Sequence, residues 1–203
     1  MAICSIILIY IILNKRMIPI KNKKKNLEAI IEEMRKFAIN YIDKFAPSKQ
    51  QLKIYLLKKY LNFKTANIKK SNISDLIDII IEDLEKSKFI NDKFYSESKA
   101  KSLIQKGSSI NKIRNYLINK GVGEKYIQNT IDGIQERNED QDFFSAIKVC
   151  KKKRIGPSRN DSNRPLFYKK DMGVLARSGF DLEVSKRVMD IEKEEYLKII
   201  NLL

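Results

Sequence analysis

The residue types that carry most enzymatic and metal chemistry are scarce in this sequence of 203 residues. There is no histidine, so the commonest general base and the commonest metal ligand are missing. The two cysteines, Cys4 and Cys150, lie far apart and belong to no CxxC pair. Neither a zinc ribbon nor a disulfide framework is therefore expected, and each thiol is interpreted as buried or incidental.

Other catalytic signatures are missing as well. The sequence contains no GxxxxGK[ST], GxGxxG or HExxH motif. Paired carboxylates, such as Glu32 with Glu33 and Glu194 with Glu195, are adjacent in sequence and so point to different sides of a helix. They indicate solvated surface. We therefore expect a binding protein that is not an enzyme and that uses neither a metal ion nor a cofactor.

The chemistry that the sequence does offer is positive charge. Lys and Arg together number 41 against 25 Asp and Glu, which gives a formal net charge of +16. This balance favours partners with negative potential, such as nucleic acid, an acidic protein groove or an anionic membrane. Codon bias combined with solubility is the alternative explanation.

The densest basic stretch after the amino-terminal run KNKKKN at 21–26 is the basic cluster, Lys151, Lys152, Lys153 and Arg154. It falls in a stretch, 151–165, that we predict to be a long loop. We interpret the cluster as facing a partner, and a merely solvated loop is the alternative. Further candidates for contact with a partner or DNA are Lys169, Arg177, Arg114 and Lys120.

A short phrase occurs twice and then, in a weaker form, a third time, at a spacing of about 60 residues. The copies are LKIYLLKK at 52–59, IRNYLINKG at 113–121 and DMGVLARSG at 171–179. Apolar residues at i, i+3 and i+4 share one face of a helix, so each copy predicts a helix with an apolar stripe. The third copy is the weakest, because Asp171 stands where Leu52 and Ile113 stand. Compositional bias toward Ile, Lys and Asn is the alternative source of this similarity.

Helical periodicity continues from about residue 27 to the end of the chain. Residues that favour helix starts and ends divide it into segments. The predicted starts are Ser48 with Gln51 as a capping box, Asn72, Asn91 and Asp181, and the predicted ends are Gly107, Gly121 and Gly179. Phe94 is predicted to belong to the apolar side of the helix that follows Asn91.

Strand signals are hard to find, because sustained alternation of apolar and polar residues and Asn-Gly turns are missing. We expect an all-α fold, an elongated, right-angled stack of three tandem three-helix repeats with helix-turn-helix-like units. Repeats of about 50 residues are too small to bury much surface alone, which favours stacking. The predicted divisions are an apolar and basic extension with the start of the first helix at 1–36, and repeats at 37–90, 91–138 and 139–203.

The amino-terminal segment requires its own interpretation. Residues 2–13, AICSIILIYIIL, are too few to span a bilayer as a helix. The charges Lys15 and Arg16 follow the apolar run, whereas a secretory signal has them before it. We expect that translation begins at Met17 or that the segment is an extension, and that 21–26 form a solvated basic arm. A membrane anchor is the alternative.

Two segments resemble the RecX family. The run INDKFYSESKAKSLIQKGSSINKIRNYLINKGV at 90–122 is similar to the central block of that family, and LARSGFDLEVSKRVM at 175–189 is similar to the end of its third repeat. The residues that carry the first similarity are Asn91-Asp92, Phe94, Lys106-Gly107, Ile113, Leu117 and Lys120-Gly121-Val122. The sequence departs from the family pattern at Ser98, Ser109 and Tyr116. The resemblance covers about residues 37–191.

The resemblance implies a cytoplasmic regulator, mainly an inhibitor, of the RecA recombinase, with roles in homologous recombination, DNA repair and the SOS response. Such a protein binds in the groove of the RecA–DNA filament and limits filament growth, ATP hydrolysis and strand exchange. The implied partners are the RecA filament and single-stranded DNA within or near it, with no membrane, and the chain is expected to be a monomer.

A direct DNA- or RNA-binding protein is the principal alternative, because three-helix units resemble helix-turn-helix modules. Such a protein would place Arg, Asn or Gln on an exposed recognition helix. Residues that could serve are Arg114, Asn115 and Asn119, or Lys186 and Arg187. A membrane-tethered adaptor that uses residues 2–13 is a third possibility.

Overall fold

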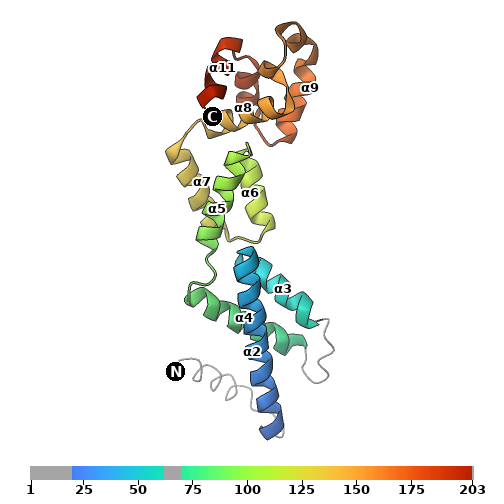
Figure 1. Cartoon of the computed structure of the whole chain (residues 1–203), viewed down its shortest axis with the longest axis vertical. Coiled ribbons are helices and arrows are strands. Elements are labelled where there is room, and N and C mark those ends of the chain that lie inside the picture. Colours follow the sequence, from blue (N-terminus) through green and yellow to red (C-terminus); the bar gives the residue numbers. More distant parts are fainter. Residues whose placement is uncertain (1–19, 62–69, 203) are drawn as a thin grey trace.

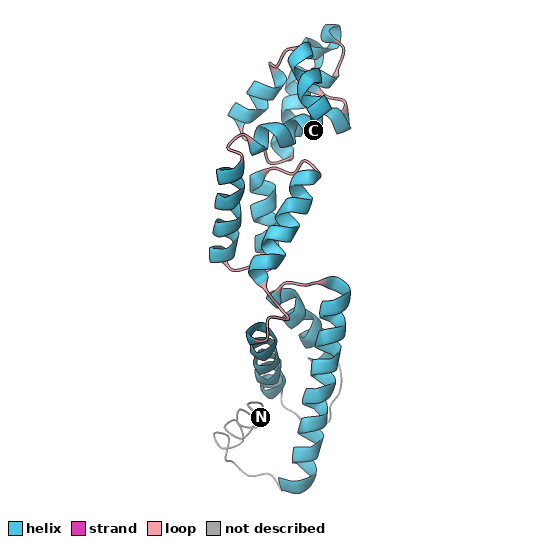
Figure 2. Ribbon diagram, turned by 60° about the vertical axis from the view of Figure 1, so that its left-hand side comes forward, coloured by secondary structure: helices cyan, strands magenta, loops and turns pink. Residues whose placement is uncertain are grey.

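The computed structural model describes residues 20–61 and 70–202, and every regular element in these ranges is helical. Figure 1 shows an elongated molecule in which three groups of helices follow one another along the long axis, and Figure 2 shows no strand in the described parts. The α-helices are α2 (Ile20–Phe45), α3 (Lys49–Leu61), α4 (Lys70–Lys86), α5 (Asp92–Gln105), α6 (Ile110–Asn119), α7 (Glu124–Arg137), α8 (Gln141–Lys153), α9 (Arg164–Arg177), α10 (Leu182–Met189) and α11 (Lys193–Leu202). Two short 3-10 helices, η1 (Gly156–Ser158) and η2 (Asp161–Asn163), lie between α8 and α9.

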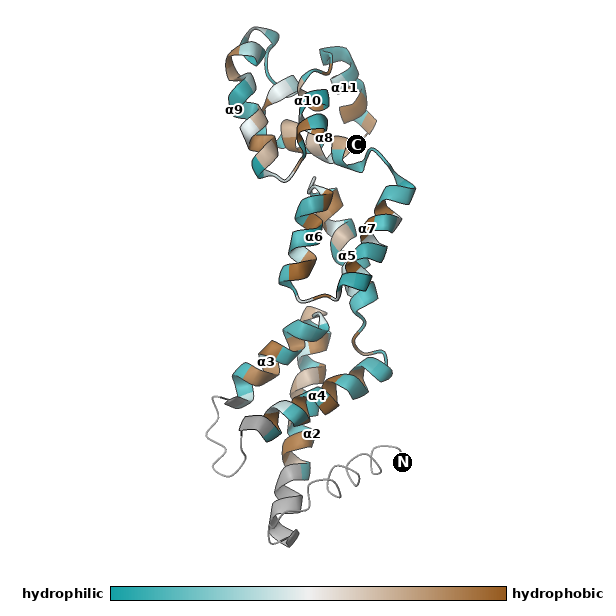
Figure 3. Cartoon of the chain, turned by 180° about the vertical axis from the view of Figure 1, so that it is seen from behind, coloured by the Kyte–Doolittle hydropathy of each residue, from teal (hydrophilic) through white to brown (hydrophobic). Residues whose placement is uncertain are grey.

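Three separate hydrophobic clusters form the core, one in each group of helices. We call the groups repeat 1 (α2–α4), repeat 2 (α5–α7) and repeat 3 (α8–α11). Apolar and polar residues are interspersed along the helices of all three repeats (Figure 3). The predicted all-α class and tandem-repeat organisation are confirmed, although repeat 3 has four α-helices and not three among the described residues. The residue boundaries proposed for the repeats remain a prediction.

Repeat 1 forms around the first copy of the repeated phrase. Leu52 and Leu56, one turn apart on α3, are fully buried. The predicted capping box is present, since the Ser48 hydroxyl accepts the Gln51 N–H and the Gln51 side chain accepts the Ser48 N–H. Two other expectations are wrong. Helix α4 begins before Asn72, and α2 already begins at Ile20, so that 21–26 are helical rather than an arm.

Repeat 2 follows the sequence signals closely. The Asn91 side chain caps α5 by accepting the Phe94 N–H, and Gly107 and Gly121 have positive φ angles of 78° and 69° at the ends of α5 and α6. One expectation for this repeat is wrong, because Phe94 is 68% exposed and takes no part in the core. The core of α5 is instead supplied by residues such as Tyr95 and Ala100.

Repeat 3 differs most from its prediction. Helix α8 continues through Lys153, so three of the four residues of the basic cluster lie in a helix and not in a loop. Lysines are favourable in the last turn of a helix, where the carbonyl groups carry partial negative charge. Asp181 caps α10 as predicted, by accepting the Val184 N–H, but a further helix follows. This helix, α11, was not predicted, and it buries Tyr196.

The apolar run 2–13 and the proposed start at Met17 lie outside the described residues. Among the helices that are described, none combines the length and the apolar character needed to cross a membrane.

Candidate functional site

The joint between repeats 1 and 2 is built from the end of one middle helix and the start of another. The Ser48 hydroxyl, at the start of α3, donates a hydrogen bond of 2.6 Å to the carbonyl of Lys120, at the end of α6. The next backbone N–H, of Lys49, donates to the carboxylate of Asp92 at 2.8 Å. These bonds satisfy groups at a helix start and a helix end that have no partner within their own helix.

The joint between repeats 2 and 3 repeats this arrangement. The Ser109 hydroxyl, at the start of α6, donates a bond of 3.0 Å to the carbonyl of Ser178, at the end of α9. The N–H of Ile110 donates to Asp142 at 2.8 Å. The three middle helices therefore follow one another head to tail, an order that places the positive start of one helix dipole on the negative end of the next.

A glycine completes each joint at the point of closest approach. A side chain at Gly121 would overlap Cβ and Cγ of Gln50, and one at Gly179 would lie 2.5 Å from the Ser109 Oγ. Both glycines also have positive φ angles, 69° and 91°. Only glycine meets both requirements without strain, because it lacks a Cβ atom.

Each joint contains a carboxylate that is partly or largely shielded from solvent, since Asp92 is buried and Asp142 is half-buried. Burial is the main influence on Asp92 and Asp142, and it raises the pKa of both despite the N–H groups that favour the ionised form. The nearby carboxylate of Glu85 raises the pKa of Asp92 further, and Asp181 does the same for Asp142. Each joint thus gains a hydrogen bond to its carboxylate, and this gain is partly offset by the cost of removing the charged carboxylate from water.

The backbone that follows the basic cluster is fixed by a buried ion pair. Asp171 is 1% exposed and accepts bonds of 2.6 and 2.9 Å from the Arg159 guanidinium and one of 2.8 Å from the Gly156 N–H. Burial by itself would raise the pKa of Asp171, but the hydrogen bonds from Arg159 and Gly156 outweigh it and the pKa is lowered. Asp171, which made the third copy of the phrase the weakest match, therefore holds the segment around Gly156 and Arg159 against α9.

The basic cluster itself is exposed at the end of α8. Lys151, Lys152 and Lys153 form the last turn, and Arg154 follows in the left-handed conformation with φ of 54° and ψ of 50°. None of the four forms an ion pair with any residue in 20–61 or 70–202. Their charges remain available to a partner.

The other four candidates divide into exposed side chains and side chains that contact other described residues. Lys169 and Arg177 lie exposed on α9, in the same repeat as the basic cluster. Arg114 on α6 is engaged, since its guanidinium binds Glu124 at 3.0 Å and Gln128 at 3.1 Å. Lys120 is half-buried at the end of α6, with its ammonium group 5.4 Å from the Tyr116 ring. The structure therefore separates the candidates between two repeats and does not gather them into one patch.

Sequence reasoning missed the joints. Ser109 was noted only as a departure from a family pattern, yet it caps α6 and binds the next repeat. The available signal was the alignment of Ser48 with Ser109 ahead of the first two copies of the phrase. Asp92 and Asp142 lie near predicted helix starts, but nothing local indicates that they reach a neighbouring repeat.

Comparisons with known proteins bear on the all-α fold and on the family resemblance noted in the sequence. No family model matches the sequence. The chain is 29% identical over 156 residues to the regulatory protein RecX of Myxococcus xanthus (strain DK1622), an alignment that covers 75% of this chain and 82% of that protein. It is also similar to a crystal structure of the regulatory protein RecX, with a TM-score of 0.58 and 19% sequence identity, over 89% of this chain and 84% of that one. The resemblance to the RecX family is confirmed.

The structural similarity at this level of identity concerns the fold alone. Neither comparison gives the positions of the residues that face a partner.

Proposed function

We propose that this chain is a regulator, mainly an inhibitor, of the RecA recombinase. It binds in the groove of the RecA–DNA filament and limits filament growth, ATP hydrolysis and strand exchange. The observation that carries the proposal is the similarity to regulatory protein RecX in sequence and fold. The implied partners are the RecA filament and the single-stranded DNA within or near it, and the protein is a cytoplasmic monomer that acts by binding and not as an enzyme.

The shape of the molecule supports this proposal. Three repeats in line form an elongated body that can contact several subunits of a filament at once (Figure 1). Many weak contacts spread over such a body make binding strong through their number, provided that all can form together. A protein that bridges filament subunits, or that blocks a growing end, does not need to saturate the filament. We therefore expect inhibition at less than one molecule per RecA protomer.

The charge distribution supports it as well. The exposed basic cluster, with Lys169 and Arg177, offers positive charge to a negatively charged surface. Contacts of this type raise the rate of association and weaken with added salt. The alternative, a direct reader of DNA, would use Arg114 with Asn115 and Asn119, or Lys186 with Arg187. Both arginines are already engaged, because Arg114 binds Glu124 and Gln128 and Arg187 binds Asp140.

Co-sedimentation with RecA filaments on single-stranded DNA tests the proposal, with bare DNA as the control. We expect the chain to sediment with the filaments and to slow their ATP hydrolysis. If the chain leaves RecA kinetics unchanged and binds bare duplex DNA with sequence preference, the direct-reader alternative is correct.

Alanine substitution of the whole basic cluster tests the surface. This variant should bind the filament more weakly and with a smaller dependence on salt, because four charges are removed. A matched control removes the same charge from exposed helical positions elsewhere, at Lys58, Lys86, Lys93 and Lys125. A larger loss in the cluster variant indicates local contact, whereas equal losses would indicate that only the net charge matters.

A further inference from the structure

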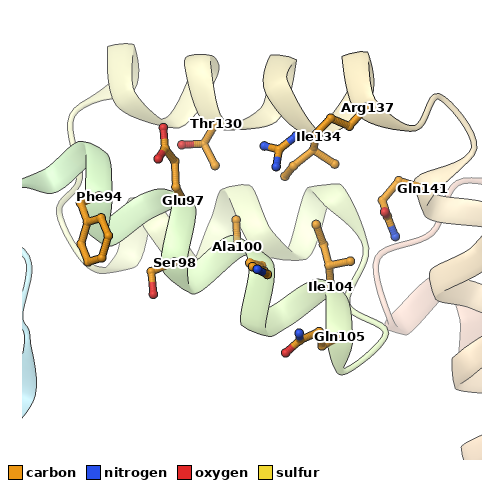
Figure 4. A pocket seen from close by; sticks show the side chains of 11 residues that line it. Phe94, Glu97, Ser98, Ala100, Ile104, Gln105, Thr130, Ile134, Arg137 and Gln141 are labelled. Atoms are coloured by element: carbon orange, nitrogen blue, oxygen red, sulfur yellow. The ribbon is translucent and has the colours of Figure 1, made fainter. Parts of the chain in front are cut away.

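Repeat 2 contains an open groove between its first and third helices. The groove has a volume of about 620 Å³, and α5 and α7 form its two sides. Figure 4 shows Phe94 and Ala100 of α5 across from Thr130 and Ile134 of α7, with Arg137 near one end. The floor is apolar, because Ala100 and Ile134 belong to the core of the repeat.

The joints show which residues of repeat 3 correspond to this groove. Asp92 of α5 and Asp142 of α8 make the same bond to a middle helix, and this equivalence aligns the two helices residue by residue. The groove positions and their counterparts are Phe94 with Phe144, Glu97 with Ile147, and Ala100 with Cys150.

In repeat 3 the corresponding face is covered. Ile147 is fully buried, although its counterpart Glu97 is exposed. Helix α11 packs against α8, and its Tyr196 joins Ile147 in one hydrophobic cluster (Figure 1). Burial raises the pKa of Tyr196, and the Cys150 thiol in the same hydrophobic cluster raises it further. A helix of this chain therefore occupies, on repeat 3, the face that is open on repeat 2.

The rim of the open groove adds positive charge to this apolar floor. Lys101 and Arg137 line it, and neither forms an ion pair within the described parts of the chain. Glu97 is the one acidic residue among the lining residues. Helix α11 shows the complementary pattern, with Glu194 and Glu195 in its first turn ahead of its buried tyrosine.

We propose that the groove between α5 and α7 binds an amphipathic helix of the protein partner, one that carries carboxylates in its first turns and a large apolar or aromatic residue. The apolar residue packs on Ala100 and Ile134, against Phe94, and the carboxylates pair with Lys101 and Arg137. This is a helix-in-groove interaction, in which side chains at helical spacing provide the contacts. The inference rests on the proposed function, since it assigns this helix to a RecA protomer of the filament.

Photo-crosslinking from the groove identifies the occupant. Ser98 is exposed and lines the groove, so Ser98→p-benzoylphenylalanine places the probe there with little effect on the core. The full-length chain is mixed with RecA filaments on single-stranded DNA and irradiated, and the crosslinked peptide is sequenced by mass spectrometry. We expect a RecA segment with acidic residues and helical apolar spacing. A crosslink to DNA, to a second copy of this chain, or to no molecule would overturn the proposal.

Two groove variants measure the contribution to binding. Phe94→Ala and the double variant Lys101→Glu with Arg137→Glu should each weaken filament binding by about tenfold, as the loss of a central interface contact does. The matched controls are Phe89→Ala, at another exposed phenylalanine, and Lys93→Glu with Lys125→Glu, which changes the same charge outside the groove. The controls should retain binding within about twofold.

The outcomes separate the two proposals. If the wild-type chain does not bind the filament, the proposed function fails and the groove assignment fails with it. If the wild-type chain binds but the groove variants bind as well as their controls do, the groove assignment alone is wrong. Circular dichroism of each variant verifies that the fold is retained, and exposed positions were chosen for this reason.

Discussion

The glycines at the joints provide a sharp test of how the repeats are held together. We consider four substitutions by alanine, two at the joints, Gly121→Ala and Gly179→Ala, and two within helices, Gly133→Ala and Gly173→Ala. The joint glycines have positive φ angles and the helical ones do not. The same chemical change should therefore have opposite effects on the free energy of unfolding.

The magnitudes follow from the local geometry. At a joint, an alanine with positive φ costs about 1–2 kcal/mol. Its Cβ also displaces a neighbouring side chain, Gln50 in one joint and Ser109 in the other, and loss of a serine hydrogen bond adds about 0.5–1.5 kcal/mol. We therefore expect Gly179→Ala to be destabilised by about 2–3 kcal/mol, and Gly121→Ala by about 1–2 kcal/mol plus the cost of displacing Gln50.

The helical glycines have room for a methyl group. The nearest atoms to a Cβ at Gly133 and Gly173 are guanidinium nitrogens of Arg137 and Arg177, at 3.5 and 3.3 Å. Both arginines are exposed and can move. Alanine should therefore stabilise each helix, by up to about 1 kcal/mol.

Urea unfolding monitored by circular dichroism measures these differences. A joint variant should also unfold over a broader range of urea, because repeats that are no longer coupled unfold separately. The account of the joints would be refuted if Gly121→Ala or Gly179→Ala were as stable as the wild-type chain. It would be weakened equally if the helical variants lost as much stability as the joint variants.

Three further predictions concern charge and core packing. Asp142→Asn keeps an acceptor for the N–H of Ile110 and should be nearly neutral, whereas Asp142→Ala should cost about 1–3 kcal/mol in urea unfolding. The folded state raises the pKa of Asp142. The wild-type chain should therefore lose stability relative to the Asn variant as pH rises from 3.8 through the folded pKa. The folded state lowers the pKa of Asp171, so the contribution of this carboxylate to the free energy of unfolding is present above pH 3.8 and is lost as pH falls through the folded pKa. Asp171→Asn should therefore cost about 3 kcal/mol at neutral pH. It should also remove the loss of stability in acid that Asp171 causes. Leu117→Ala should cost about 2–5 kcal/mol through a core cavity and lower the melting temperature, whereas alanine substitution of the basic cluster should weaken filament binding without such a change.

Features that depend on neighbours in sequence could be predicted well. The caps at Ser48, Asn91 and Asp181 and the glycine ends of α5 and α6 result from bonds that span only a few residues. The buried stripe of the repeated phrase, such as Leu117, follows from helical spacing alone. These signals were enough to establish the all-α class and the order of the helices up to α10, whereas α11 was not predicted.

Features that depend on tertiary partners could not be predicted in the same way. Asp171 interrupts an apolar pattern and so indicated a weak copy, because its partner Arg159 lies in a different segment. Phe94 has the spacing of a core residue, but it lies beside a groove that no helix of repeat 2 fills. Lys151 to Lys153 resemble a loop by composition, but they continue α8 beyond its buried residues Val149 and Cys150.

The basic residues of repeat 3 fall into two groups, those that bind other parts of the chain and those that face solvent. Arg164 donates to the carbonyls of Met189 and Ile191, and Lys193 donates to those of Pro157 and Arg159, so these cations bind backbone that would otherwise lack partners. Removing Arg164 would weaken the connection between α10 and α11, and removing Lys193 would weaken the loop between α8 and α9, so any loss of partner binding would be indirect. The basic cluster has no such internal role among the described residues, and its charges face solvent. A loss of filament binding without a loss of stability can therefore come from the cluster but not from Arg164 or Lys193, and this difference makes the cluster the informative place to test charge-dependent binding.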